Sequence, residues 1–124
     1  MQFLGPLGDD AMVKCYQQCD LFVLPNRQVG ANFEGFGMVL LEAQACGKPV
    51  IAGASGGTAE TMRIPETGRR VDCEGPELLV ETVIELLGNR AEMRVMGERA
   101  REWALEFDWP ATAKKAAAAF AEAK

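Results

Sequence analysis

Two short apolar runs, each closed by a turn-forming residue, constrain the fold more than any other feature of the sequence. Leu21–Leu24 is a continuous apolar segment stopped by Pro25, and Pro49–Ala52 is a second run followed by Gly53. A strand that faces water on one side alternates apolar and polar residues, whereas an uninterrupted run is typical of a parallel strand buried on both faces. The two runs therefore predict a parallel sheet covered by helices.

Segments with helical periodicity separate these runs and fill the end of the chain. Asp9–Cys19 and Gly37–Cys46 show helical spacing, and further helical segments follow residue 75. Strands that alternate with helices predict an α/β fold. We expect an incomplete Rossmann-like parallel sheet of about four short strands, flanked by helices, with a helical C-terminal third. The expected strands are Phe3–Leu4, Leu21–Leu24, Val50–Ala52 and Arg69–Val71.

The length of 124 residues fits one domain with one core. We expect this single domain, 1–124, to consist of an α/β part at 1–74 and a helical part at 75–124. Because the net charge is −5 and no Lys/Arg cluster is present, we expect no nucleic-acid partner. No apolar run approaches the ~20 residues needed to span a bilayer. With no signal peptide visible either, we expect a cytoplasmic protein without a transmembrane segment.

The cysteines do not form a metal-binding pattern. Of the four, none forms a Cys-x-x-Cys pair, and the chain has no histidine to complete a zinc site. Reduced cysteines that behave as small apolar residues are favoured over a disulfide framework. We therefore expect no metal or other cofactor, and no mechanism that uses a histidine base.

The loop before the helix at residue 37 is the most informative place for chemistry. Gly35 and Gly37 flank Phe36, and glycines there let backbone amides approach a ligand closely. The helix start adds free N–H groups and the positive end of a dipole, which favour a diphosphate. Glu34 and Glu42 lie eight residues apart across this junction and could each bind vicinal hydroxyls of a sugar. Spacing alone, however, favours two solvated surface acids over a ligand site.

A resemblance changes that balance. The chain resembles the family 4 retaining glycosyltransferases, which have the GT-B fold of two Rossmann-like domains with the active site between them. The matching segments follow one another in order over nearly the whole chain: Leu21–Pro25, Glu34–Ala43, Gly47–Ala52, Gly56–Gly57 with Glu60, Glu66–Gly68 and Phe107–Trp109.

The resemblance implies a role for each matching residue. Glu34 is similar to the first glutamate of the E-x7-E motif, the catalytic glutamate that contacts the transferred sugar, where it positions and stabilises charge rather than acting as a nucleophile. Glu42 is similar to the second glutamate, which holds the ribose hydroxyls. The resemblance also implies that the backbone at Gly35, Phe36, Gly37 and Met38 contacts the sugar and phosphates of a nucleotide-diphosphate sugar donor.

Two further residues are weaker candidates. Arg27 follows the strand that ends at Pro25 and could neutralise a phosphate, although a loop arginine is more often solvated. Thr58 lies in the glycine-rich loop after the next strand, where capping a helix is at least as good an explanation as ligand contact.

The resemblance also implies missing parts. Family members carry an N-terminal acceptor domain, and an earlier strand–helix–strand segment that supplies an Arg and a Lys to the diphosphate. We therefore expect the donor-binding part of a glycosyltransferase, inactive or weakly active alone. The alternative is a non-catalytic interaction module or half of a split enzyme. An exposed sheet edge predicts a homo-oligomer or a complementary N-terminal domain as partner.

Overall fold

The structure is a computed structural model that describes residues 1–32 and 35–123. Its centre is a parallel sheet of three short strands in the order β1-β2-β3: β1 (Phe22–Leu24), β2 (Val50–Gly53) and β3 (Gly68–Val71). Strand β2 is central, and all four of its residues are buried, as its uninterrupted apolar sequence predicts. The α/β prediction with a small parallel sheet is confirmed.

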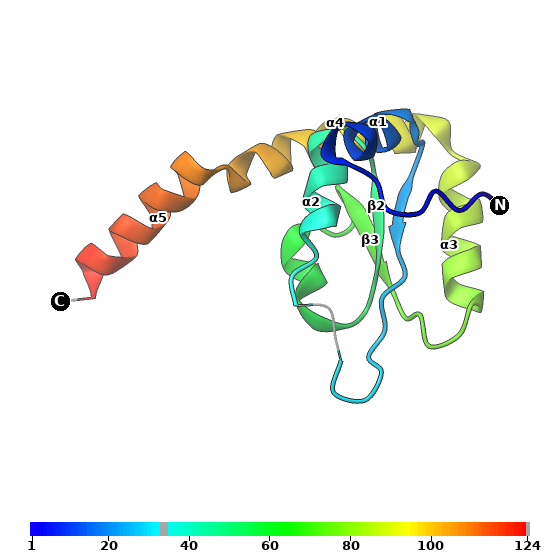
Figure 1. Ribbon diagram of the computed structural model, residues 1–124, viewed down its shortest axis with the longest axis horizontal. Helices are drawn as coiled ribbons and strands as arrows, with labels where there is room; N and C mark the ends of the chain where they lie inside the picture. The colour runs from blue at the N-terminus through cyan, green and yellow to red at the C-terminus, as the bar shows by residue number, and fades with distance from the viewer. Residues whose placement is uncertain (33–34, 124) are drawn as a thin grey trace.

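Helices cover both faces of this sheet (Figure 1). In chain order the helical elements are α1 (Asp9–Gln18), α2 (Met38–Ala45), the 3-10 helix η1 (Gly56–Thr61), α3 (Glu77–Leu87), α4 (Arg90–Ala104), the 3-10 helix η2 (Leu105–Phe107) and α5 (Trp109–Glu122). Asn89 and Asp108 cap α4 and α5 through side-chain oxygens that accept backbone N–H groups.

Alternation along the strands divides the core into two clusters. Val50 and Ala52 pack with Tyr16 of α1 and Leu40 of α2, whereas Ile51 between them packs against the other face. The partners of Ile51 include Leu86, Met93 and Met96, from α3 and α4. Successive strand residues point to opposite faces, so one buried strand serves two helical layers.

The expected strand at Phe3–Leu4 is wrong. No residue before α1 forms a strand or helix, and Phe3 remains 86% exposed. An extended segment is a stable strand only where a neighbouring strand pairs with its backbone groups and a face of it is buried. Within the described residues β1 pairs only with β2, so the outer edge of β1 carries no partner strand. Residues 1–32 and 35–123 therefore form a sheet of three strands rather than about four.

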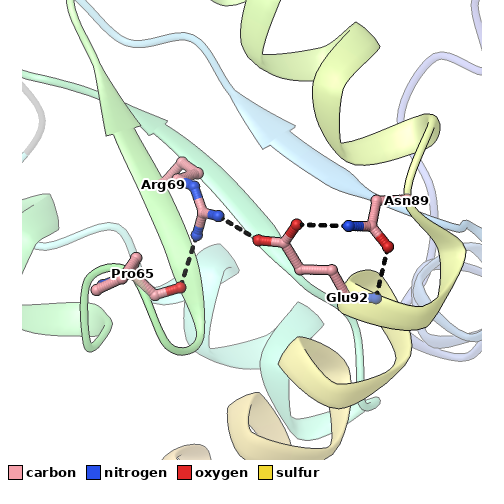
Figure 2. Close-up of polar contacts among 4 residues, drawn as sticks. All are labelled: Pro65, Arg69, Asn89 and Glu92. Atoms are coloured by element: carbon pink, nitrogen blue, oxygen red, sulfur yellow. Dashed lines mark hydrogen bonds and ion pairs between the residues drawn. The ribbon is translucent and has the colours of Figure 1, made fainter.

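A polar network joins the last strand to helix α4 (Figure 2). Arg69 on β3 pairs with Glu92 on α4 and also donates to the carbonyl oxygen of Pro65 at 2.6 Å. Glu92 in turn accepts from the side chain of its own helix cap, Asn89, at 3.1 Å. The Arg69 and Glu92 side chains are 21% and 34% exposed, so this pair is less screened than a surface ion pair.

We expect Glu92→Ala to lower the free energy of unfolding by about 1–2 kcal/mol, because it leaves a half-buried Arg69 guanidinium without its carboxylate. Urea denaturation would measure this loss. The matched control is Glu98→Ala, whose partner Arg94 lies on the exposed face of the same helix. That control is expected to cost no more than about 0.5 kcal/mol. Equal losses for the two variants would contradict a special role of Glu92.

Candidate functional site

The candidate site lies at the carboxyl edge of the sheet, where ligands bind in open α/β folds. The loops that leave β1 and β2 converge there through the side chain of Asn26. Its amide oxygen accepts the backbone N–H of Gly53 at 2.9 Å, and its amide nitrogen donates to the carbonyl oxygen of Ser55 at 2.9 Å. One amide side chain thus holds together two loops that are distant in sequence.

Two glycines allow these loops to approach so closely. A Cβ atom at Gly53 would lie 1.7 Å from the carbonyl oxygen of Asn26, and one at Gly57 would lie 2.2 Å from the carbonyl oxygen of Gly35. Gly57 instead donates its N–H to that same Gly35 oxygen at 3.0 Å. The glycine-rich loop after β2 therefore brings the predicted donor segment at Gly35 against the sheet.

Helix α2 begins at this junction. Gly37 is its N-cap residue with a φ of 81°, a left-handed conformation that favours glycine. A glycine cap has no side chain to occupy the first amides of the helix. Among these amides, the Leu40 N–H donates to the carbonyl oxygen of Gly37 at 2.9 Å. Met38, the first helical residue, is exposed. The start of α2 is therefore open to an anion at the carboxyl edge.

The ring of Phe36 anchors the loop from below. It packs 6.3 Å from the ring of Phe107, which makes an edge contact with Trp103 at 5.0 Å. Trp103 also donates its indole N–H to the carbonyl oxygen of Thr61 at 3.0 Å. These half-buried aromatic residues link the loop at Gly35 and Phe36 to η1 and to the end of α4. Because the ring of Phe36 is used in this packing, only its backbone faces a possible ligand.

Glu42, about one turn after the start of α2, is exposed and has a hydrogen-bond partner on the neighbouring helix. Its Oε2 atom accepts a hydrogen bond from the hydroxyl of Tyr16 on α1 at 2.9 Å. Burial, followed by the hydrogen bond and the negative charge of Glu42, raises the pKa of Tyr16 well above its usual value. The phenol therefore stays protonated and remains a donor to Glu42 at neutral pH.

The two weaker candidates lie in different surroundings. Thr58 is fully buried, and its hydroxyl donates to the carbonyl oxygen of Gly53 at 3.0 Å, so it shapes the loop from inside. Arg27 is exposed and lines a shallow hollow together with Cys73, Glu74 and Leu79, next to the loop after β3. The structure thus places Thr58 beneath the start of α2 and Arg27 beside the opposite helical layer.

The first glutamate of the predicted pair, Glu34, lies outside the described residues. Gly35, Phe36, Gly37 and Met38 do come together at the carboxyl edge, with Glu42 on the same helix. Sequence reasoning missed Asn26 and Tyr16, which hold the site. Asn26 directly follows Pro25, which ends the strand, and this position could have indicated a role at the carboxyl edge. Nothing in the sequence indicates that Tyr16 and Glu42 come together.

Two classes of feature are absent from the described part of the chain. Residues 1–32 and 35–123 contain no group of three or more His, Cys, Asp or Glu side chains arranged to hold a metal ion. Over the same residues, no helix combines the length and apolar character that crossing a membrane requires. The four cysteines are free and half-buried, and burial raises the pKa of Cys19 and Cys73.

Comparison with known proteins identifies the family. Residues 1–103 match the family described as "Glycosyl transferases group 1". Over 113 residues the chain is 42% identical to a GDP-mannose-dependent monoacylated alpha-(1-6)-phosphatidylinositol monomannoside mannosyltransferase of Corynebacterium glutamicum. That match covers 86% of the chain and 29% of the relative.

Solved structures show the same fold. The sucrose-phosphate synthase of Thermosynechococcus elongatus aligns with a TM-score of 0.82 at 30% identity, over 98% of this chain and 29% of that one. The Anabaena HepE protein, solved in complex with UDP and glucose, aligns with a TM-score of 0.79 at 24% identity, over 98% of this chain and 32% of that one. The chain thus spans less than a third of the length of each of these proteins. It belongs to the group 1 glycosyl transferases and corresponds to their C-terminal GT-B domain.

Proposed function

We propose that this chain binds the nucleotide-diphosphate sugar donor of a retaining hexosyltransferase. The observation that carries the proposal is the start of α2, where the glycine-capped amide end and Glu42 lie on one short helix at the carboxyl edge. The amide end favours a diphosphate, and a carboxylate favours a vicinal diol. A nucleotide sugar presents phosphates flanked by diols, so it fits both features of this helix.

The relatives support the same ligand class. The mannosyltransferase relative is described as GDP-mannose-dependent, and HepE is a structure with UDP and glucose. In this chain the first glutamate, Glu34, would contact the transferred sugar and Glu42 the ribose. The backbone from Gly35 to Met38 would face the sugar and the diphosphate.

Transfer of the sugar requires more than donor binding. Catalysis in a two-domain enzyme depends on closing a cleft that orients donor and acceptor and excludes water. The relatives are more than three times as long as the part that this chain matches. We propose that the chain alone binds donor nucleotide but transfers sugar weakly or not at all, and that it needs no metal to bind the nucleotide.

Calorimetric titration with UDP-, GDP- and ADP-sugars tests the proposal. Glu42→Ala is expected to weaken the affinity roughly 10- to 100-fold, because the ribose would lose its hydrogen bond to a charged carboxylate. Glu81→Ala, on the exposed surface of α3, is the matched control and should leave the affinity unchanged. An affinity that survives Glu42→Ala would remove Glu42 from the site, and no binding by the wild-type chain would contradict the function itself.

A second function, partner binding, rests on the uncovered apolar surface. Helix α5 extends away from the body of the molecule (Figure 1), with Trp109 85% and Phe120 80% exposed. Exposed aromatic residues favour association with another chain or domain, as does the edge of β1 that has no partner strand among the described residues. We propose a complementary N-terminal glycosyltransferase domain as that partner, and a homo-oligomer as the alternative. Sedimentation of the chain alone, compared with its mixture with such a domain, separates the two.

A further inference from the structure

The hydrogen bond between Tyr16 and Glu42 points to a role for α1 in the donor site. Tyr16 is 6% exposed, and its ring packs edge-on against Phe22 with the ring centroids 5.4 Å apart. The residues packed around the ring hold the Tyr16 hydroxyl in one place, 2.9 Å from Glu42 Oε2. The buried hydroxyl of Tyr16 thus donates to Glu42, which is exposed to solvent.

The contact occupies only part of the carboxylate. An ionised carboxylate accepts through two oxygens with about four lone-pair positions. Oε2 accepts from Tyr16, and no residue in the described part of the chain donates a hydrogen bond to Oε1. Glu42 therefore keeps capacity for a further donor, such as a ligand hydroxyl, while its orientation is set from one side.

A free glutamate on a helix surface samples several rotamers, and a ligand that needs one of them must select it. A buried phenol that holds the carboxylate removes that cost before the ligand arrives. We propose that Tyr16 is a positioning residue that pre-orients Glu42 for the ribose diol of the donor, and thereby favours ribonucleotides over their deoxy analogues. This inference rests on the proposed donor site.

A purely structural role makes a different prediction. If the hydrogen bond only fastens α1 to α2, its loss would loosen the domain and lower the affinity for every nucleotide equally. If the hydrogen bond orients Glu42, its loss lowers the affinity only for ligands that carry the ribose diol. Comparing a ribonucleotide with its dideoxy analogue therefore separates the two roles.

The test uses Tyr16→Phe, which removes the hydroxyl and keeps the buried ring. We expect its affinity for UDP or GDP to fall about 3- to 10-fold, less than for Glu42→Ala, because the carboxylate remains and only its orientation is no longer held. Its affinity for the matching dideoxyribonucleoside diphosphate should equal that of the wild type. In a Glu42→Ala background, Tyr16→Phe should cause no further loss. The inference would be overturned if Tyr16→Phe lowered the affinity for both nucleotides equally, or if it caused the same loss in the Glu42→Ala background. Either result would leave the proposed donor site unchallenged.

A second measurement needs no ligand. Tyr16 is the single tyrosine of the chain, so the near-ultraviolet absorbance of its phenolate reports one group. Glu42→Ala should lower the pKa of Tyr16, because the carboxylate helps to keep the phenol protonated. An unchanged pKa would show that the two side chains do not interact in solution and would overturn the inference. Failure of the wild-type chain to bind any nucleotide would instead contradict the proposed function, and the inference with it.

Discussion

Gly53→Ala is expected to lower the free energy of unfolding by about 3 kcal/mol or more, because the added methyl overlaps backbone atoms of the neighbouring loop. Gly53 ends the central strand and is buried. The added Cβ would lie 1.7 Å from the carbonyl oxygen of Asn26 and 2.9 Å from its backbone nitrogen. Both obstacles are backbone atoms, so no side-chain rotation relieves the overlap. The loop after β1 must move away, and the two hydrogen bonds of Asn26 that join the loops would be lost with it.

Urea denaturation followed by circular dichroism measures this loss. The control is Gly8→Ala, where a Cβ meets nothing within 4 Å and the backbone has an ordinary φ of −70°. That substitution should change the free energy of unfolding by less than about 1 kcal/mol. A Gly53→Ala protein as stable as this control would show that the two loops separate at little cost. Because the same loops carry Gly35 and Gly57, we also expect Gly53→Ala to weaken nucleotide binding.

The central strand of the sheet, β2, could be predicted because burial on both faces leaves a simple sequence signature. Val50–Ala52 is apolar throughout, and alternation places Ile51 on one face and its neighbours on the other. The Phe3–Leu4 run has a similar composition but forms no strand, since composition does not say whether a neighbouring strand is present. Local apolar content therefore predicts a strand only when its partner is part of the same fold.

The site was predictable to the extent that it depends on local chemistry. Glycines before an apolar helix predict an open helix start, and the structure has one at Gly37. The contacts that hold the site together join residues that are far apart in the sequence, such as Tyr16 with Glu42, 26 positions away, and Asn26 with Gly53, 27 positions away. No periodicity connects such residues. Asn26 and Gly53 meet because parallel strands bring successive loops to one edge, and Tyr16 and Glu42 meet because α1 packs against α2. Both are properties of the folded domain rather than of any one segment.

Ile51→Ala is expected to lower the free energy of unfolding by about 2–5 kcal/mol. Ile51 is fully buried on the central strand, where Leu86, Met93 and Met96 surround it. The truncation removes apolar contacts and leaves a cavity in a layer that two helices share. A small domain is stable by only about 5–15 kcal/mol, so the variant would lie close to its unfolding threshold.

The same chemical change on the surface provides the control. Ile84, one turn before the end of α3, is 66% exposed. Ile84→Ala should change the free energy of unfolding by less than about 0.5 kcal/mol, because it creates no cavity and alanine favours the helix. Thermal and urea unfolding of the two variants compare one truncation in two surroundings. A small loss at Ile51 would mean that Leu86 and the two methionines collapse into the space, since flexible methionine side chains refill gaps more readily than branched ones. A large loss confined to Ile51 would show that this layer, from which α3 and α4 hold the central strand, is rigidly packed, and that β2 is therefore a fixed support for the loop at Gly53.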